Sequence, residues 1–294
     1  MKIDTQSLIA DLPDTLAKWF AQRLRRPFVG QLSADERVQL EQHSGLSGEA
    51  LALALLPMAA TLSIAPVSHF KVGAIAIGRS GALYLGANLE LQGQTLFHSV
   101  HGEQSAISNA WLAGETGLEA MVINASPCGH CRQFMNELQY ADQLKVVLPE
   151  QGSQSLSHYL PYAFGPTDLG IDTGLMATQQ HQLTCAHTDP VIQLALQHAN
   201  ASYAPYSGSP SAVVLQTDAG QCFAGRYAEN AAFNPSLPPM QMALSAMALA
   251  QIPFSAIRRA VLLQSAQGQI DQRHSAAGAL ATVSDIGLET ILVE

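Results

Sequence analysis

His101, Cys128 and Cys131 are the residues whose types and spacing predict chemistry, because imidazole and thiolate groups are ligands that zinc prefers. The two cysteines are three positions apart, so at the start of a helix both thiols face the same point. A helix N-terminus also favours the thiolate form, which binds metal. The interval of 27 positions from His101 to Cys128 (128 − 101) leaves room for a helix, a loop and a strand. The spacing therefore predicts one zinc ion per chain.

Three protein ligands leave one position of a tetrahedral zinc ion open, as catalytic zinc sites do. A zinc ion activates the water molecule held at such a position, because the metal lowers the pKa of the water. Glu103 lies two residues after the histidine and is the natural carboxylate to carry a proton to the leaving group. These residues therefore favour a hydrolase.

The same region is also compatible with other interpretations. A Cys-x-x-Cys pair alone is also typical of a redox pair or of half a structural zinc knuckle. His98 lies one helical turn before His101, and His130 lies between the cysteines, so each is a rival ligand. Neither has an acidic residue two positions further on, and we assign neither to the metal.

The composition of the chain restricts its partners. The 294 residues carry a formal net charge of −9, whereas a polynucleotide partner requires a basic face. Apolar residues make up 48%, which is enough for a large core. Four cysteines do not form a disulfide framework, and we recognise no secretory leader or membrane span. We therefore expect a cytoplasmic protein without nucleic-acid or membrane partners.

Longer motifs around these residues carry a resemblance to a known family. Zinc deaminases have the signature H-x-E…P-C-x-x-C, and this chain carries it as His101-x-Glu103 and Pro127-Cys128-x-x-Cys131. The chain also resembles cytidine deaminases in four segments, Phe70–Ala74, Asn88–Glu90, Glu103–Ile107 and Ser126–Phe134. The resemblance runs through nearly the whole chain and is to the two-domain bacterial form of the family, which is a homodimer.

The resemblance implies the reaction and several roles. Free cytidine and 2′-deoxycytidine are the expected substrates, deaminated by hydrolysis to uridine and 2′-deoxyuridine with release of ammonia, as in pyrimidine salvage. Zinc is the implied cofactor, and Glu103 is the implied proton shuttle. Phe70 is expected against the base, while Asn88 and Glu90 are expected toward the sugar hydroxyls. Phe70 as a plain core residue and Asn88 as a plain turn residue remain alternatives.

The resemblance also implies that each active site of the homodimer is completed by the C-terminal domain of the partner. The matching segment here is Ala228–Pro235, with Ala231 and Phe233 as the expected contacts, and Phe164 is a weaker candidate for the same wall. One residue departs from the family pattern, because Gly102 stands where the family usually has alanine. We expect this change to leave more room beside the base without affecting the ligands.

The order of predicted elements places these motifs on a scaffold. Hydrophobic periodicity and turn residues predict the order strand, strand, helix, strand, helix, strand between residues 71 and 148, with the first two strands joined as a hairpin by a turn at Arg79–Gly81. The two helices are predicted from about Val100 to Ala113 and from Cys128 to Tyr140, so their N-termini converge on one side of a mixed sheet. Helical patterns precede this region and include the capping box Ser33–Glu36. The residues from Pro149 to about Asp189 are expected to form an irregular linker.

The second half of the chain repeats the first at an offset of 139 positions (204 − 65). The pattern Ala65-Pro66-x-Ser68 returns as Ala204-Pro205-x-Ser207. The other matching pairs are Gly81 and Gly220, Gly86 and Gly225, and Glu90 and Glu229. The same offset takes the ligands and Glu103 to residues that cannot hold zinc, namely Met240, Met242, Gln267 and Ile270. We therefore predict a duplicated fold whose second copy has no metal. Because Glu229 is kept in that copy, a structural role for Glu90 stays open.

The predicted fold class is α/β, with duplicated mixed-sheet, cytidine deaminase-like three-layer α/β/α domains and a small N-terminal helical extension. The expected boundaries are an extension over 1–47, a catalytic zinc domain over 48–167, a linker over 168–186 and a metal-free domain over 187–294. Two rival functions were considered. A polynucleotide cytosine deaminase is disfavoured by the acidic charge, and a non-catalytic zinc-stabilised binding module requires a fourth protein ligand.

Overall fold

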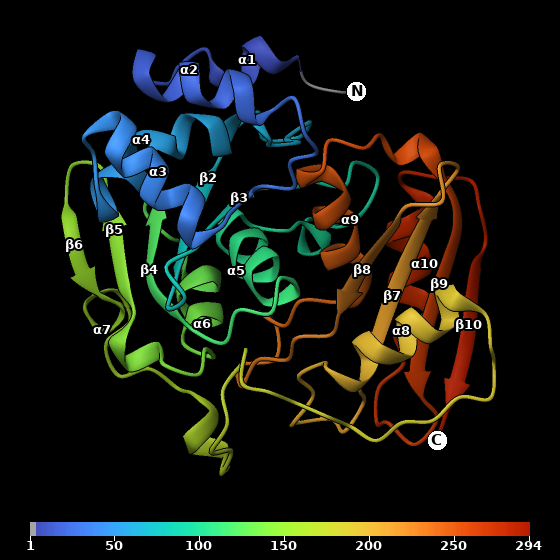
Figure 1. Cartoon of the computed structure of the whole chain (residues 1–294). Helices are drawn as coiled ribbons and strands as arrows, with labels where there is room; N and C mark the ends of the chain where they lie inside the picture. The colour runs from blue at the N-terminus through green and yellow to red at the C-terminus, as the bar shows by residue number, and fades with distance from the viewer. Residues whose placement is uncertain (1–3) are drawn as a thin grey trace.

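Two β-sheets organise the structure, a computed structural model that describes residues 4–294 (Figure 1). The first sheet has the strand order β1-β3-β2-β4-β5-β6, and the second has the order β10-β9-β7-β8. The strands of the first sheet are β1 (Gln31–Leu32), β2 (Gly73–Gly78), β3 (Leu83–Ala87), β4 (Leu118–Ile123), β5 (Lys145–Leu148) and β6 (Gly152–Ser155). Those of the second are β7 (Ser211–Thr217), β8 (Cys222–Arg226), β9 (Ile257–Ser265) and β10 (Leu288–Val293).

Helices form layers on both sides of each sheet (Figure 1). The outer face of the first sheet carries α1 (Thr5–Ile9), α2 (Asp14–Arg23), α3 (Ala34–Ser44) and α4 (Gly48–Thr61). Four helices lie between the two sheets, namely α5 (Gly102–Leu112), α6 (Gly129–Met135), α9 (Pro239–Leu249) and α10 (Arg273–Ala281). The outer face of the second sheet is covered by α8 (Pro190–Asn200), and the short α7 (Leu156–Tyr159) follows β6.

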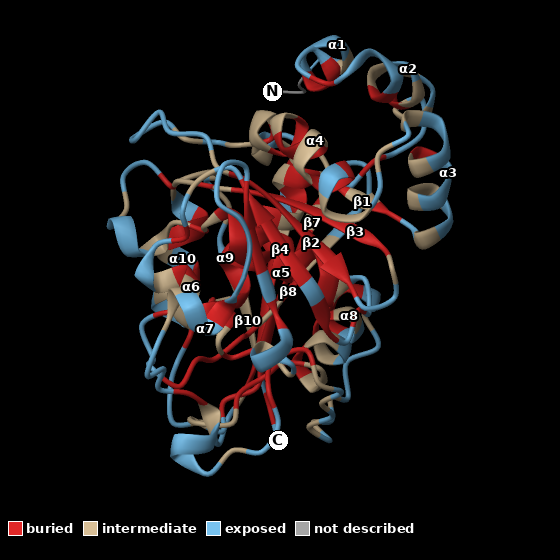
Figure 2. Cartoon of the chain, turned by 90° about the vertical axis from the view of Figure 1, so that its left-hand side faces the viewer, coloured by how far each residue is buried: buried red, intermediate tan, exposed pale blue. Residues whose placement is uncertain are grey.

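The hydrophobic core follows these layers. One cluster joins the inner faces of both sheets through the four helices between them, and one smaller cluster lies on each outer face. The burial view shows the strands and α5 as the buried centre, with exposed residues on the outer loops and helices (Figure 2). The helix that begins at the predicted metal-binding histidine is therefore enclosed by both halves of the chain.

Four strands of the first sheet have the same topology as the four strands of the second, which confirms the predicted α/β fold and its duplication. In each sheet an antiparallel hairpin, β2–β3 or β7–β8, lies beside an antiparallel strand, β4 or β9. That strand then pairs in parallel with the next, β5 or β10. An irregularity in the strand register recurs as well, between Ile77 and Gly78 and, 139 positions later (216 − 77), between Gln216 and Thr217.

Two pairs of glycines show why the repeat keeps this residue type. Gly81 and Gly220 turn the two hairpins with φ of 85° and 77°, in the left-handed region that favours glycine. A Cβ at Gly86 would lie 2.1 Å from a backbone atom of α5, and a Cβ at Gly225 would lie 2.0 Å from one of α9. The inner helix of each copy therefore packs directly on the backbone of a strand.

Some predicted details of the scaffold are wrong. The residues expected to form an irregular linker from Pro149 onward contain β6, which pairs with β5, and α7. The helix predicted from Cys128 to Tyr140 ends at Met135. The short elements α1 and β1 were not predicted. By contrast, the capping box Ser33–Glu36 is present at the start of α3, and the predicted hairpin is present as β2–β3.

The mapping of the zinc positions onto the second copy also requires correction. The glycine contacts align α5 with α9 at an offset of 137 (239 − 102), and the first residues of α6 and α10 differ by 144 (273 − 129). Loop lengths therefore differ between the copies. The strands β2, β3 and β4 keep the offset of 139 to β7, β8 and β9, whereas β5 and β10 differ by 142 (288 − 146). The glycine contacts place Pro238 opposite His101 and Met240 opposite Glu103, and Gln272 is the N-cap residue of α10 as Cys128 is of α6.

No single helix within residues 4–294 is long and apolar enough to span a membrane. Helices α3 and α4 reach the necessary length and composition only when taken together, and they meet at a bend of 94°.

Candidate metal centre

Two helix N-termini bring the predicted zinc ligands together. His101 is the N-cap residue of α5 and Cys128 is the N-cap residue of α6, with Cys131 in the first turn of α6. The His101 Nδ1 atom lies 3.5 Å from the Cys128 Sγ atom and 3.3 Å from the Cys131 Sγ atom. The two sulfur atoms are 3.6 Å apart. The three side chains thus face one point, as their spacing predicted.

The cluster has the shape and the chemistry of a tetrahedral zinc site. Zinc bonds of about 2.0–2.1 Å to nitrogen and about 2.3 Å to sulfur place such ligand atoms roughly 3.5–3.8 Å apart. The observed distances are close to these values. Hydrogen bonds with Cys131 and His101 lower the pKa of Cys128 to about 3, which supplies a thiolate. The residues present therefore fit zinc.

No fourth protein ligand joins this cluster among the described residues. His98 accepts a hydrogen bond from the side chain of Gln241 at 3.0 Å. The ring of His130 stacks on the ring of His101, with a centroid distance of 4.8 Å. Three protein ligands leave a coordination position for water, as in catalytic zinc sites.

Glu103 lies in the first turn of α5, beside the ligands. Its side chain is buried, and that burial raises the pKa of its carboxyl group. A carboxyl group with a raised pKa both accepts and donates a proton more readily near neutral pH. The site therefore pairs a metal-binding cluster with an acid/base group on the same helix.

A cavity of about 420 Å³ opens beside the cluster. It is lined by His101, Cys128, Glu103 and all four substrate-contact candidates of the first copy, Phe70, Asn88, Glu90 and Gly102. Sequence reasoning missed other lining residues, including Val67, Ser68, Val72, Leu96, Ser99 and Ser126. Ser68 belongs to the repeated Ala-Pro-x-Ser pattern, and Val72 belongs to the motif that begins at Phe70, so the sequence contained a signal for both. No sequence pattern pointed to Leu96.

The polar side chain of Asn88 shapes the wall of this cavity. Its Oδ1 atom accepts a hydrogen bond from the backbone N–H of Val72 at 2.9 Å, and its Nδ2 atom donates to the carbonyl oxygen of Phe70 at 2.9 Å. The ring of Phe70 itself is 59% exposed, so it is not a core residue of the isolated chain. Asn88 therefore fixes the backbone that presents Phe70.

Glu90 holds another loop of the same wall. Its carboxylate accepts hydrogen bonds from the backbone N–H groups of Val67 and Ser68 at 2.8 and 3.0 Å. Glu229 accepts the corresponding bonds from Tyr206 and Ser207 in the second copy at 2.7 and 3.2 Å. The structural role that the repeat left open for Glu90 is therefore present in both copies.

The space left by glycine at position 102 is occupied. A Cβ at Gly102 would lie 2.8 Å from the Cγ1 atom of Val72, which lines the cavity. The extra room expected beside the base is therefore filled by a neighbouring side chain.

Ala231 and Phe233 do not line the cavity of their own chain. They belong to the loop 228–235, which follows β8. Phe233 is 67% exposed and has a φ of 62°, a conformation that bulky residues rarely adopt. Phe164 is exposed as well and lies outside the cavity.

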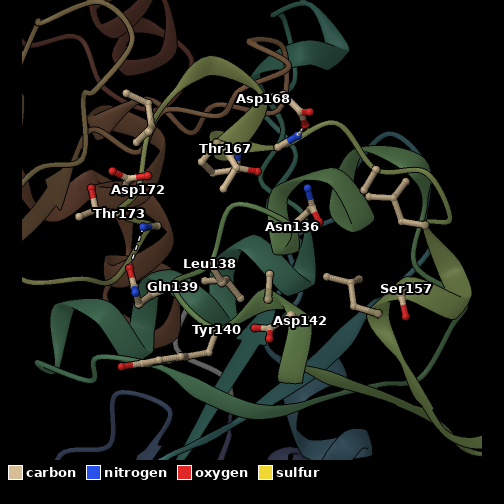
Figure 3. A pocket seen from close by; sticks show the side chains of 18 of the residues that line it. Asn136, Leu138, Gln139, Tyr140, Asp142, Ser157, Thr167, Asp168, Asp172 and Thr173 are labelled. Atoms are coloured by element: carbon tan, nitrogen blue, oxygen red, sulfur yellow. Dashed lines mark hydrogen bonds between the residues drawn. The ribbon is translucent and has the colours of Figure 1, made fainter.

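A second hollow, of about 550 Å³, lies beneath the segment that follows α7 (Figure 3). The residues that line this hollow include Asp142, Asp168 and Asp172, which Figure 3 labels. No histidine or cysteine lines it. Gln139 accepts a hydrogen bond there from the backbone N–H of Gly174 at 2.7 Å. None of the predicted site residues lies in this hollow, so the chemistry belongs to the smaller cavity.

Comparisons with known proteins identify the family of the chain. A family model described as the cytidine and deoxycytidylate deaminase zinc-binding region matches residues 49–147, and a second model of the same description matches residues 156–277. Cytidine deaminases of Shewanella loihica and Shewanella sediminis are 56% and 53% identical over 286 residues, which are 97% of this chain and 97% of each relative. The crystal structure of cytidine deaminase from Burkholderia pseudomallei is 28% identical, covers 40% of this chain and 100% of its own, and has a TM-score of 0.36.

Proposed function

The chain belongs to the cytidine deaminase family, and on that premise we propose that it hydrolyses free cytidine and 2′-deoxycytidine to uridine and 2′-deoxyuridine, with release of ammonia. It is a hydrolase, and zinc is its cofactor. The observation that carries the proposal is the cluster of His101, Cys128 and Cys131 beside a cavity that Glu103 also lines. A role in pyrimidine salvage follows from these substrates and products.

We assign metal binding and proton transfer to different residues of the first copy. Zinc, when held by His101, Cys128 and Cys131, supplies a Lewis acid that activates water for attack at C4 of the pyrimidine. Glu103 takes one proton of that water and delivers it to N3. It then takes the remaining proton from the new hydroxyl group at C4 and gives it to the amine, which leaves as ammonia. This role is supported by the position of Glu103 in the first turn of α5, two residues after the histidine.

Substrate contacts are assigned to other residues that line the cavity. The exposed ring of Phe70 stacks against the base. Asn88 and Glu90 bind the sugar hydroxyls. Glu90 has acceptor capacity left for this contact, because one of its carboxylate oxygens accepts only from the hydroxyl of Ser68. The Oδ1 atom of Asn88 already accepts from the Val72 N–H and the Ser63 hydroxyl, whereas its Nδ2 group donates one hydrogen to Phe70 and has a second for the sugar. Gly102, with Val72 against it, forms the wall beside the base.

An absorbance assay with cytidine, run with zinc analysis and ammonia detection, tests the activity. We expect one zinc ion per chain and equal amounts of uridine and ammonia. Zinc-loaded protein that turns over neither nucleoside would contradict the proposal. Salt-dependent binding and deamination of single-stranded DNA or RNA would instead favour the polynucleotide enzyme.

We further propose a C₂ homodimer in which the loop 228–235 of each chain closes the cavity of its partner, with Ala231 and Phe233 at the substrate. The exposed aromatic side chain at the loop tip supports this arrangement, because it leaves the cavity of its own chain uncovered. Closure excludes water other than the reacting molecule. Mixing inactive Glu103→Gln chains with inactive Phe233→Ala chains should restore up to one working site per mixed dimer. Full activity in a monomer would reject the shared site.

The domain boundaries at 1–47, 48–167, 168–186 and 187–294, and a cytoplasmic location, also remain our proposals. Limited proteolysis tests the boundaries, because cleavage is expected first within 168–186. Cell fractionation tests the location, and recovery of the enzyme in a membrane fraction would contradict it.

A further inference from the structure

Glu137 is a buried carboxylate that the proposed mechanism does not use. It lies just beyond α6, the helix that begins at the cysteine motif, and its side chain is 0% exposed. The carboxylate accepts hydrogen bonds from the hydroxyl groups of Tyr203, at 2.9 Å, and Tyr206. It also accepts one from the backbone N–H of Ala231, at 2.9 Å. All three donors belong to the second copy, so Glu137 joins the zinc-binding helix to the other half of the chain.

This arrangement indicates a positional role for the carboxylate. Burying a charged group is costly unless hydrogen bonds satisfy it, and a well-packed apolar side chain is often as stable in such a place. A carboxylate fixes the positions of the groups around it, because each of its two oxygens accepts hydrogen bonds at a preferred distance and angle. One of the groups held in this way is the backbone of the loop 228–235.

The same loop is strained and is tied to α6 at a second point. Phe233 has a positive φ of 62°, which costs energy and persists only where surrounding contacts enforce it. The side chain of Asn230 donates a hydrogen bond to the carbonyl oxygen of Gln133 in α6 at 2.9 Å. The rings of Tyr206 and Phe233 lie 6.4 Å apart. The base of the loop is therefore fixed by α6 while the ring at its tip stays exposed.

The other exposed aromatic candidate, Phe164, is held by the same helix region. Its carbonyl oxygen accepts hydrogen bonds from the side chains of Gln133, at 2.7 Å, and Asn136, at 3.1 Å. Phe164 and the loop that carries Phe233 are thus both hydrogen-bonded to the segment that contains this chain's own cysteine ligands.

We propose that Glu137 is a positioning residue for the active site of the partner subunit. Glu137 orients the loop 228–235 of its own chain, so that Phe233 of that loop reaches the substrate bound in the partner. The inference rests on the proposed homodimer. Although Glu137 lies beyond the zinc-binding helix of its own chain, it acts on the other site. The competing explanation is that Glu137 only supports α6 and therefore acts on its own site.

Mixed dimers distinguish these two explanations. A dimer of one Glu137→Gln chain and one Glu103→Gln chain has a single site with an intact Glu103, and that site is closed by an unaltered loop. Action on the partner therefore predicts about half of the wild-type activity with a wild-type KM, since one of two symmetric sites works. If Glu137 acts on the site of its own chain, the single working site should be as impaired as each site of the Glu137→Gln homodimer.

The reciprocal dimer reverses the expectation. One wild-type chain is paired with one Glu103→Gln/Glu137→Gln chain, so the only working site is closed by the altered loop. Action on the partner predicts impaired activity, and action on the own site predicts about half of the wild-type activity. Half activity in this dimer, with low activity in the first, would overturn the inference.

One control separates failure of the inference from failure of the proposed function. A dimer of wild-type and Glu103→Gln chains should show about half of the wild-type activity. An active Glu103→Gln homodimer would reject the assigned chemistry, and a monomeric active enzyme would reject the shared site. Neither result depends on Glu137.

Kinetics of the homodimers give a second readout. Glu137→Gln should raise the KM for cytidine about tenfold, as expected for loss of one charge-assisted contact, with a smaller change in kcat and full zinc content. Tyr206→Phe, which removes one donor and keeps the carboxylate, should change KM in the same direction. Hydrogen exchange should become faster in residues 228–236 in both variants.

Glu115→Gln is the matched control for these measurements. Glu115 is another buried carboxylate of the first copy, and it accepts a hydrogen bond from the hydroxyl of Tyr84 at 3.3 Å. This substitution should lower stability and leave the KM unchanged. An unchanged KM in both Glu137→Gln and Tyr206→Phe, or an equal rise in Glu115→Gln, would show that Glu137 does not position the loop.

Discussion

The two copies of the fold have the same scaffold and different residues at the start of their inner helices. In the first copy the N-cap residues of α5 and α6 are His101 and Cys128. In the second copy the N-cap residues of α9 and α10 are Pro238 and Gln272. The sheet topology, the hairpin turns and the close approach of helix to strand are common to both. Metal chemistry therefore depends on a few side chains at two helix N-termini, and the fold alone does not supply it.

The second copy has other contacts in place of a metal centre. Its residue Glu229 orders a loop as Glu90 does in the first copy, and Tyr203 and Tyr206 donate to Glu137 across the boundary between the copies. The first copy thus carries the candidate metal centre, and the second copy packs against it and carries the loop 228–235.

Replacing one ligand should have the largest effect. Cys128→Ala leaves two ligands, so we expect loss of zinc and of nearly all activity, because both metal retention and water activation fail. The matched change at the same cap position of the second copy, Gln272→Ala, should keep one zinc ion per chain and full activity per folded molecule. Metal analysis and the cytidine assay check both variants. Retention of zinc and turnover by Cys128→Ala would remove the asymmetry between the copies.

Glu103→Gln should separate metal binding from catalysis. We expect full zinc content and retained nucleoside binding, with kcat lowered by about 10²- to 10⁴-fold or more, because this carboxylate transfers the proton more than once. Its counterpart in the second copy, Met240→Leu, is a volume-conserving change that should leave kcat unaltered. A Glu103→Gln enzyme that keeps a tenth of the wild-type rate would speak against the shuttle.

Alanine at the paired glycines tests the shared scaffold. Gly86→Ala and Gly225→Ala each force a methyl group against the backbone of an inner helix, and each should lower the free energy of unfolding by about 3 kcal/mol. Only Gly86→Ala displaces α5 and its histidine, so zinc occupancy should fall in that variant alone. Thermal unfolding and metal analysis measure the two effects. Equal loss of zinc in both variants would show that zinc binding by the first copy depends on the packing of the second.

Gly102→Ala should have the smallest effect. The new methyl group meets Val72, and we expect kcat/KM to fall by roughly tenfold, corresponding to about 1.4 kcal/mol of overpacking. Val72→Ala should restore the activity when combined with Gly102→Ala, because it vacates the contested space. Additive losses in the double variant, measured with cytidine, would mean that the two side chains do not compete.

Local patterns accounted for much of the fold. The capping box Ser33–Glu36 and the turn at Gly81 act over three or four residues, so their consequences were readable from the sequence. The strand β6 was missed because Gly152–Ser155 is polar and exposed and has no apolar alternation. It forms a strand only because the edge of β5 offers it backbone hydrogen-bonding partners.

The sequence by itself determined the duplicated α/β scaffold and the side chains able to hold zinc, because caps, turns and hydrophobic periods depend on neighbouring residues. Only the tertiary structure decided that Glu137 meets Tyr206 and Ala231, which lie 69 and 94 positions away. It also decided that Val72 fills the space beside Gly102. Such contacts depend on elements that meet only after folding, and neither the partners of a buried carboxylate nor the shape of a gap is encoded in residue spacing.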